Sequence, residues 1–361
     1  MSGMDLAITG LGLVLPCGDG IDAARASLAS GLPCFGDLPE QLGQGRGAAC
    51  TLFNPAGIIP PMQLRRLDRP SRFAWAAAHQ AFLDAGLDPR TMGERIAVCV
   101  GTLTGGSEAS EAFMRPYLQR GVEGASPMLF PNSVANAASG HLALAFGLKG
   151  PSGTFVDREN ATFTALEQGA RWLRSGLADA VLVIAMDGLF PMLLDVCRGA
   201  RLLDRHGNPE PGSGRGFLPG EGAQAFVLEA EERAQTRKIR PRAMLKALAS
   251  RSTPDRSDEA RIRALERATE ACLADPPVDR RIGGASGLPR LDVLEAALAN
   301  RHPEWPEPLH PKQLWGEFAG AGGPLLAAAL LEPADSVLIT APASSGAQFA
   351  ARLEGVRLER S

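Results

Sequence analysis

Glu159 carries the most chemical information in this chain of 361 residues. It lies in the stretch GPSGTFVDRENATFTALEQGARWLRSGLADAVLVIAMDG, residues 150–188, which predicts a strand, a turn at Glu159, a helix and a second buried strand. A carboxylate at this turn can hold charge or share a proton. It is a poor acyl carrier, because its acyl adduct is a labile anhydride.

The same stretch resembles the nucleophile segment of the β-ketoacyl-ACP synthases, members of the thiolase superfamily. In that family a Gly-Pro-Ser opens a buried strand, and a Cys sits at the turn into a small-residue helix that ends in Gly-x-Ala-Asp. Residues 150–152 (GPS), 176–179 (GLAD) and the apolar strand 180–185 match this frame. Counting along the frame places Glu159 at the acyl-accepting Cys. The resemblance therefore implies a retained scaffold whose chemistry is changed or removed.

Six segments across nearly the whole chain follow the condensing-enzyme pattern in the right order. They are residues 8–12 (ITGLG), 65–86, 101–106 (GTLTGG), 138–150, 216–223 (GFLPGEGA) and 312–323. The resemblance implies an α/β, thiolase-like fold in which two related βα halves pack as alternating α/β/α/β/α layers. We predict an N-terminal half at residues 1–237, which carries the degenerate nucleophile turn, and a shortened C-terminal half at residues 238–361.

The two catalytic His positions of the family also hold other residues. The HGTGTxxxD loop corresponds to residues 284–292 (GASGLPRLD), which places Gly284 at the first His. The KxxxGHxxGAAG motif corresponds to residues 312–323 (KQLWGEFAGAGG), which keeps Lys312 and places Glu317 at the second His. Decarboxylative condensation needs a thiolate to carry the acyl chain and two imidazoles to stabilise the enolate. The resemblance therefore implies loss of the condensing reaction.

A third loop departs from the family in the same sense. The C-terminal NSFGFGG loop, which gates the acyl pocket in the family, corresponds to residues 341–347 (APASSGA), and the gating Phe becomes Ser345. Ser344 and Ser345 could act as nucleophiles only with a base, and none of the five His falls at an active-site position of the frame. We interpret both serines as loop residues.

Glu159 has three interpretations at this stage. It is a remnant without a role, an anchor paired with a cation beside Asp157 and Arg158, or a new catalytic group. The third depends on Glu317, since the Cys and this His face each other in one pocket of the family fold. Two facing carboxylates share a proton and split their pKa values, as in an acid–base dyad. Lys312 nearby can equally neutralise the pair.

In its lack of the catalytic Cys and both His, the chain is most similar to a chain-length factor. The resemblance implies a catalytically inactive subunit that pairs with an active ketosynthase in type II polyketide, polyene or fatty-acid-type biosynthesis. Thiolase-fold subunits pair through the strand before the nucleophile turn, here about residues 153–156, and obligate interfaces bury about 2,000–5,000 Å². By the same analogy, a helical hairpin reaches towards the partner's acyl tunnel, where its bulky residues set chain length: Phe113, Met114, Tyr117, Met128 and Phe130.

Two alternatives to this function stay open. One is an enzyme of changed chemistry, a hydrolase or acyltransferase that uses Glu159 and Glu317. The other is a homodimer that binds an acyl ligand or a carrier protein without turning it over. The expected partners are an active ketosynthase subunit and, after it, an acyl carrier protein.

Composition excludes several other classes of protein. The net charge of −3 offers no electrostatic case for binding nucleic acid or an anionic membrane surface. No run approaches eighteen apolar residues, and the N-terminus lacks a basic segment, so we expect neither a membrane span nor a signal peptide. The six Cys are scattered without CxxC pairs, which favours reduced thiols in a cytoplasmic protein. The bias towards Ala, Gly and Arg suggests a GC-rich bacterial genome. We expect no cofactor and no metal.

Hydrophobic periodicity predicts the elements that position these residues. A strand at residues 6–15 is followed by a helix at residues 21–30. A helix at residues 65–86 carries Phe73, Ala77, Phe82 and Leu83 at helical spacing. Near the C-terminus we expect a Gly/Ala-rich helix at residues 315–331 and a closing strand at residues 336–340.

Overall fold

The computed structural model describes residues 5–204, 206, 215–273, 278–318 and 322–357. The strands of its first half are β1 (Leu6–Leu15), β2 (Gly18–Asp19), β5 (Ile96–Thr102), β6 (Ser152–Val156), β7 (Ala180–Asp187) and β8 (Gly222–Ala230). Those of the second half are β9 (Ala243–Ser252), β10 (Arg280–Ile282), β11 (Pro308–Leu309), β12 (Ala334–Ala341) and β13 (Ala347–Val356). A separate small sheet joins β3 (Gly36–Asp37) to β4 (Arg46–Gly47).

The two halves of the large sheet repeat one strand order. The first half runs β6-β5-β7-β8-β1 and the second runs β11-β10-β12-β13-β9. In each half the first two pairings are parallel and the last two are antiparallel. The same order with the same pairing directions confirms the expected thiolase-like fold of two related halves. The proposed boundary at residues 237 and 238 stays a prediction.

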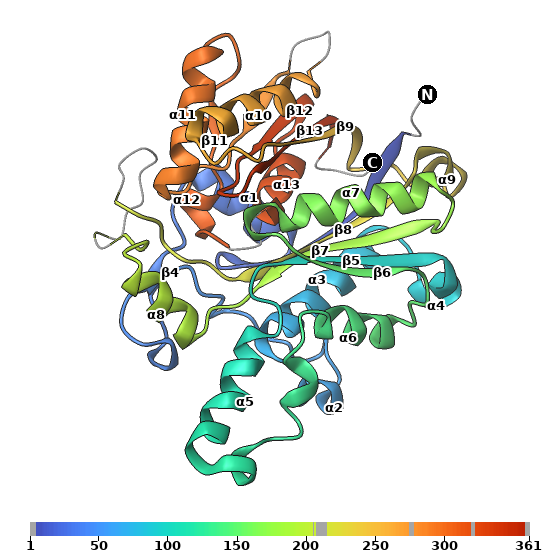
Figure 1. Ribbon diagram of the computed structural model, residues 1–361. Helices are drawn as coiled ribbons and strands as arrows, with labels where there is room; N and C mark the ends of the chain where they lie inside the picture. Colours follow the sequence, from blue (N-terminus) through green and yellow to red (C-terminus); the bar gives the residue numbers. More distant parts are fainter. Residues whose placement is uncertain (1–4, 205, 207–214, 274–277, 319–321, 358–361) are drawn as a thin grey trace.

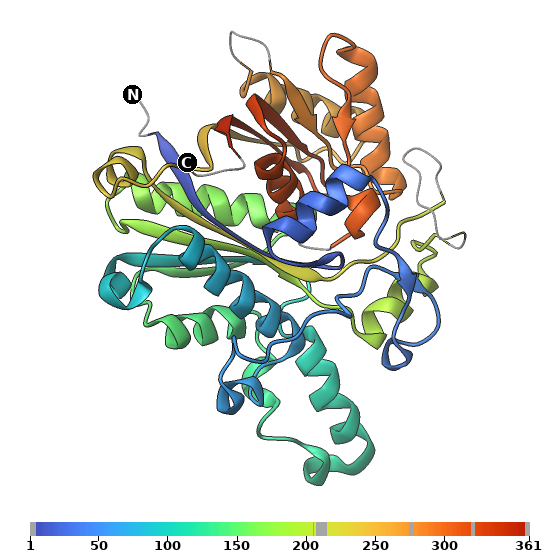
Figure 2. The same ribbon diagram turned by 180° about the vertical axis from the view of Figure 1, so that it is seen from behind.

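Helices separate and cover the strands in three layers (Figures 1 and 2). Helices α3 and α6 cover the outer face of the first-half strands, α10 and α11 cover the second half, and α7 and α13 lie between the halves. The α/β/α/β/α layering is therefore as predicted. The helices are α1 (Ile21–Ser30), α2 (Pro61–Leu64), α3 (Arg69–Asp84), α4 (Pro89–Met92), α5 (Ser107–Arg120), α6 (Ala137–Phe146), α7 (Ala161–Arg174), α8 (Pro191–Gly199), α9 (Glu231–Thr236), α10 (Asp258–Glu270), α11 (Pro289–Arg301), α12 (Lys312–Trp315) and α13 (Gly322–Leu331).

Strand β1 connects the two halves. Its residues 6–8 pair with β9, and beyond them the strand leaves β9 while it continues to pair with β8. The freed amides of Leu11 and Leu13 donate to side chains of α3, Asp84 at 2.8 Å and Gln80 at 2.8 Å. Buried amides need a hydrogen-bond partner. These two α3 side chains therefore allow one sheet network to divide into two layers.

Helices α7 and α13 meet at their N-terminal ends in the middle layer. Every residue of α13 is buried. A Cβ on Gly322, its first residue, would lie 2.6 Å from a ring carbon of Phe163 and 2.9 Å from Cβ of Thr162, both in the first turn of α7. Because glycine has no Cβ, the two helices can begin side by side at this point.

The prediction of one helix at residues 315–331 is wrong, because helical structure stops at the end of α12. Gly316 has φ of +87°, a conformation that side-chain-bearing residues rarely adopt. Glu317 then forms a parallel β-bridge with Pro219, and α13 begins only at Gly322. The break matters for function, since it places Glu317 in extended chain rather than on a helix face.

Two other expectations also need correction. Leu83 lies on the narrow solvent side of α3 and is 69% exposed, whereas Phe73, Ala77 and Phe82 are buried as predicted. The strand predicted at residues 336–340 is not the last one, since β13 follows β12. The sequence of β13, AQFAARLEGV, has weak strand preference, and pairing with β12 on one side and β9 on the other compensates for this.

Residues 107–134 form an arm that projects from the layered body (Figures 1 and 2). The arm contains α5 and two 3₁₀ turns, η3 (Gly121–Gly124) and η4 (Phe130–Asn132). The expected helical hairpin is therefore α-helical on one side only. Seven large apolar side chains of the arm are exposed: Met114, Tyr117, Leu118, Val122, Met128, Phe130 and Val134.

Replacing Gly12 by Ala should destabilise the fold. A Cβ on Gly12 would lie 1.9 Å from the carbonyl oxygen of Ala77 in α3, so the helix must move away from β1. We expect a loss of about 1–3 kcal/mol or more in the free energy of unfolding, measured by chemical denaturation. Gly36→Ala is the control, because nothing lies within 4 Å of that Cβ position. Equal stability of the two variants would contradict the close packing of α3 on β1.

Candidate functional site

Glu159 lies at the turn between β6 and α7, as predicted. The 3₁₀ turn η5 (Arg158–Asn160) leads directly into α7, and Arg158 has a positive φ of 48°. A non-glycine residue in this region is strained, and such strain clusters at functional sites. The buried Asn160 donates from Nδ2 to the carbonyl of Ala347 at 2.6 Å and holds the turn against β13.

Ser344 is the hydrogen-bond partner of Glu159. Its hydroxyl lies 2.9 Å and 3.1 Å from the two Glu159 oxygens, and its amide donates to Oε2 at 3.3 Å. The guanidinium of Arg158 donates to the same hydroxyl at 3.1 Å. Arg158 therefore reaches Glu159 through Ser344, while the carboxylate of Asp157 accepts from Thr164 at 2.8 Å. Sequence analysis assigned Ser344 to loop structure only, because its contact with Glu159 spans 185 residues of chain.

Glu317 forms a buried ion pair with Lys312. The Lys312 Nζ lies 3.1 Å from each Glu317 carboxylate oxygen, and the two side chains are 1% and 5% exposed. Burial raises the pKa of the Glu317 carboxyl, Lys312 and the Ser286 hydroxyl oppose the rise, and the Glu159 carboxylate adds to it. Lys312 therefore compensates the charge of Glu317, which is one of the roles that the sequence suggested for it. Residues 320 and 321 of the same motif lie outside the described part of the chain.

Gly284 faces a proline where the family frame has its first His. A Cβ on Gly284 would lie 2.6 Å from Cδ and 2.9 Å from Cγ of Pro342. The Gly284 amide donates to Glu295 at 2.8 Å, and the Ser286 amide donates to Asp292 at 3.0 Å. Both acceptors lie on α11, so this helix holds the loop that precedes it. A side chain at position 284 would require Pro342 to move.

One cavity of about 370 Å³ brings three of the predicted residues together, Glu159, Glu317 and Ser344. Lys312 reaches it only through Glu317, and Gly284 and Ser345 do not line it. The remaining lining includes apolar side chains and two cations: Leu103, Leu189, Leu193, Leu202, Phe217, Leu288, Arg158 and Arg290. The arrangement can hold an apolar ligand with a polar end, and two carboxylates in one cavity can share a proton.

Asp187 also lines this cavity, at the end of β7. Its carboxylate accepts from the Thr102 hydroxyl at 2.9 Å, the Thr104 hydroxyl at 2.6 Å and the Thr104 amide at 2.8 Å. These bonds fix the glycine-rich loop 101–106 to the end of β7. Asp187 therefore has a structural role.

The aromatic residues predicted to face a partner pack on one another within the arm. The rings of Phe113 and Tyr117 stack with centroids 6.3 Å apart, and Phe113 meets Phe130 at 5.6 Å. Met114 and Met128 are 42% and 62% exposed. Phe113 is half-buried by its neighbours, whereas Tyr117 and Phe130 remain exposed. Whether this surface meets a partner stays a prediction.

A second cavity of about 500 Å³ lies against the other side of α5. Burial, together with the carboxylates of Asp68 and Glu221, raises the pKa of Glu108 in its lining to about 7, while Arg69 opposes the rise. Sequence analysis missed Glu108, because nothing in the polar pattern of α5 marks it as enclosed. A Cβ added to Gly188, which lines the first cavity, would lie 3.5 Å from Glu108 Oε2. The two cavities are therefore neighbours.

Comparisons with known proteins agree with the resemblance. Residues 4–234 match the family model for the β-ketoacyl synthase N-terminal domain. The 3-oxoacyl-[acyl-carrier-protein] synthase 2 of Coxiella burnetii is 30% identical over 249 residues, and that of Staphylococcus aureus strain COL is 27% identical over 244. Each match covers 64% of this chain and 59% of the relative, so the chain spans less than two thirds of the length of these relatives.

Solved structures share the fold over nearly the whole chain. The ishigamide ketosynthase/chain length factor has a TM-score of 0.88 at 21% identity and covers 98% of this chain and 99% of its own. A β-ketoacyl synthase from Burkholderia phymatum STM815 has a TM-score of 0.86 at 20% identity, with 98% and 100% covered. Within the described residues, no helix is long and apolar enough to cross a membrane.

Lys312→Met should destabilise the protein increasingly as pH rises. Without the ammonium, the folded-state pKa of Glu317 rises further above its unfolded value, so stability is lost as pH rises through that range. We expect a loss of about 3–5 kcal/mol near neutral pH, smaller at about pH 5 and larger at about pH 8. Chemical denaturation at both pH values measures it. Lys312→Met with Glu317→Gln should recover stability and remove the pH dependence; persistence of that dependence would place its source elsewhere.

Proposed function

Because the chain belongs to the β-ketoacyl synthase family, we propose that it is a non-condensing, chain-length-factor-like subunit that pairs with an active ketosynthase. In this role it shapes the acyl tunnel in type II polyketide, polyene or fatty-acid-type biosynthesis. The observation that carries the proposal is the carboxylate of Glu159 at the turn into α7, the place of the family's nucleophile. A carboxylate does not replace a thiolate as an acyl carrier, because its adduct is an anhydride.

The neighbourhood of Glu159 supports a stable, non-covalent role. Ser344 donates to both of its oxygens, from its hydroxyl to Oε1 at 2.9 Å and from its amide to Oε2 at 3.3 Å. Hydrogen bonds to both oxygens hold the side chain in place and occupy the lone pairs that would attack a thioester. Its bonding instead links the nucleophile turn to the gating-loop equivalent at residues 341–347.

The two other catalytic positions support the same conclusion. Pro342 crowds the side of Gly284 from which an imidazole would project. Glu317 is paired with Lys312 and carries negative charge where the family chemistry needs a donor for an enolate oxygen. A carboxylate beside a developing oxyanion repels it, so this geometry disfavours condensation even if a thiol is supplied.

Two surface features support pairing with another subunit. Strand β6 is the edge of the large sheet, and its Val156 is 54% exposed. An open edge strand is a ready template for pairing with another chain, and soluble proteins normally protect it. Helix α6 contacts both β6 and the η4 turn of the arm, and its Leu144 is 86% exposed. The edge, α6 and the arm thus offer one connected, partly apolar face for a partner.

The structural neighbours fit this assignment. One is described as a ketosynthase/chain length factor, and another as a type II polyketide synthase acyl-carrier protein in complex with its ketosynthase, with a TM-score of 0.79 at 20% identity. By analogy we infer an active ketosynthase as the first partner and an acyl carrier protein as the second. A homodimer that binds an acyl ligand or carrier protein is the alternative assembly.

One observation favours a second function. Glu159 and Glu317 line the same cavity, and the pKa of Glu317 responds to Glu159. Two coupled carboxylates in a partly apolar cavity could serve a hydrolase or acyltransferase of changed chemistry. Lys312 weakens this case, since it already compensates Glu317. Loss of a measured turnover in both Glu159→Gln and Glu317→Gln would favour the enzyme over the partner subunit.

Glu159→Cys should not restore condensation. The variant supplies a nucleophile, but Gly284 and Glu317 still provide no enolate donor, and each missing donor of this type costs about 3–4 kcal/mol in transition-state stabilisation. Intact-mass spectrometry after incubation with acyl-ACP should show no adduct on the natural chain, and product analysis with malonyl-ACP should show none for the variant. A stoichiometric acyl adduct on the natural chain, or condensation by Glu159→Cys, would refute the non-condensing role.

In complex with an active ketosynthase, Ala substitutions in the aromatic cluster should lengthen the product if one ring forms the tunnel floor. A smaller side chain leaves room for additional methylenes. Phe113→Ala, Tyr117→Ala and Phe130→Ala are compared by product mass spectrometry after each complex is shown to assemble. Leu118→Ala, on the same helix but outside the aromatic contacts, should leave chain length unchanged. An unchanged product in all three assembled complexes would mean that the arm does not set chain length.

A further inference from the structure

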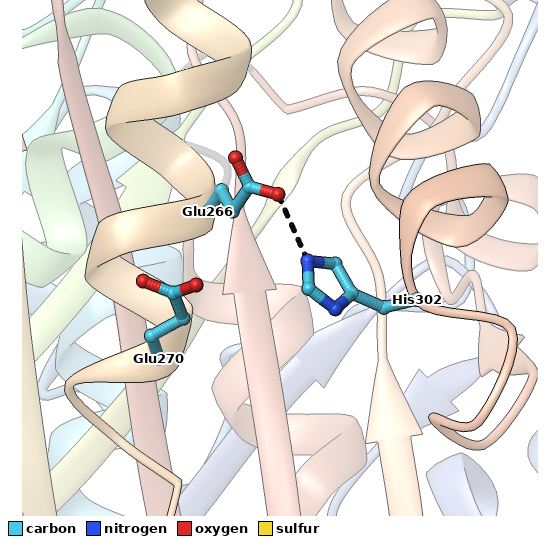
Figure 3. Close-up of side chains that lie close together, drawn as sticks. All are labelled: Glu266, Glu270 and His302. Atoms are coloured by element: carbon cyan, nitrogen blue, oxygen red, sulfur yellow. Dashed lines mark hydrogen bonds and ion pairs between the residues drawn. The ribbon is translucent and has the colours of Figure 1, made fainter.

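A second group of chemically capable side chains lies in the outer layer of the second half. Glu266 and Glu270 are one turn apart on α10, and His302 follows the last residue of α11. One ligand atom of each, a carboxylate oxygen or a ring nitrogen, lies within 4.8 Å of the other two. Figure 3 shows Glu266 and Glu270 on one helix and His302 reaching towards them from the neighbouring one. Imidazole and carboxylate at this spacing are donors that divalent metal ions use.

His302 lies between two carboxylates, and a neutral ring cannot donate a hydrogen bond to both of them. Its Nε2 is 2.9 Å from Glu266 Oε1, and its Nδ1 is 3.1 Å from Glu304 Oε1. An ionised carboxylate only accepts hydrogen bonds, and a neutral imidazole has only one N–H. A single N–H therefore serves one of the two contacts, and the other ring nitrogen presents a lone pair to a carboxylate. A metal ion between Nε2 and Glu266 would accept electron pairs from both groups.

The surroundings of His302 fix its ring in the orientation that a metal ligand needs. Glu304 on Nδ1 takes the place of the carboxylate that commonly orients a metal-binding His. The ring of Trp305 stacks on the imidazole with centroids 3.9 Å apart and planes 4° from parallel. Both contacts hold Nε2 towards Glu266, and the His302 side chain is only 19% exposed.

We propose that Glu266, Glu270 and His302 bind one divalent d-block cation such as Zn²⁺. A tetrahedral zinc ion with bonds of about 2.0–2.1 Å holds its ligands roughly 3.3 Å apart. The 2.9 Å contact between His302 and Glu266 opens by about 0.4 Å to admit it. Glu270 is exposed and free to swing inward as the third ligand, and water completes the fourth position.

The charge of this face is compatible with a cation. Arg301 donates to Oε2 of Glu266 at 3.1 Å and to Glu259 at 2.8 Å, which leaves Oε1 of Glu266 for the ion. Arg263 pairs with Glu259 at 3.0 Å. The cluster and the ion pairs around it comprise four carboxylates and two guanidinium groups: Glu259, Glu266, Glu270, Glu304, Arg263 and Arg301.

Metal bound here would join α10 to the end of α11 and stabilise the outer layer of the second half. An ion that binds only the folded state raises the unfolding temperature, and the stabilisation grows with the logarithm of the ratio of ion concentration to Kd. This inference is independent of the proposed function, because the cluster lies on α10 and α11 and none of its residues lines the cavity at Glu159.

Metal titration of the full chain tests the site. The parent carries Cys17→Ser and Cys34→Ser, because these half-exposed thiols could bind zinc themselves. Isothermal titration with ZnCl₂ and visible spectroscopy with CoCl₂ should show one ion per chain. Glu304→Gln should weaken binding roughly tenfold to hundredfold, and Glu270→Gln and His302→Asn at least as much. The ion should raise the unfolding temperature of the parent and not that of the ligand variants.

Glu259→Gln is the matched control, since it removes a carboxylate from the same helix without removing a ligand. Its affinity should stay within about twofold of the parent, because general surface charge contributes little at ordinary ionic strength. Failure of the parent to bind Zn²⁺ or Co²⁺ overturns the proposal. Binding that survives Glu270→Gln and His302→Asn, or that falls equally in Glu259→Gln, overturns it as well.

Discussion

The contact between the first turns of α7 and α13 is the constraint on which the candidate site depends. These helices hold equivalent places in the two halves, α7 between β6 and β7 and α13 between β11 and β12. Gly322 lets them begin side by side against Phe163. The residues that precede the two helices are therefore brought to one cavity. Glu159 and Glu317 both line it although their residue numbers differ by 158.

The same constraint decides what the cavity can do. Glu317 is buried and Glu159 is half-buried in this cavity, so their carboxylates need partners. Lys312 compensates Glu317, and Ser344 with Arg158 surrounds Glu159. The cavity thus combines apolar walls with compensated charges, and in the proposed function these charges stand in place of the groups that a condensing reaction needs. This combination fits a subunit that supports an acyl tunnel better than one that forms a carbon–carbon bond.

The outward faces differ in how much they are covered. The middle layer is sealed on both sides by sheet, and α3 and α10 seal much of the outer faces. Strand β6, Leu144 of α6 and the arm at residues 107–134 leave apolar surface and an open strand edge exposed. The core is buried within the single chain, whereas this face is exposed in it. The proposed partner would complete the sheet at the edge where the chain alone leaves it open.

From the sequence alone, the resemblance of ordered motifs to a known family determined the expected fold, and hydrophobic periodicity determined the bounds of β1 and α1. These depend on periodicity and on motif spacing, which are written in neighbouring residues. Tertiary structure alone decided the break at Gly316, the formation of β13, the Ser344–Glu159 bond and the crowding of Gly284 by Pro342. Each of these arises from contacts between distant segments. Their energies depend on which atoms the packed layers bring together, and a linear pattern does not record that.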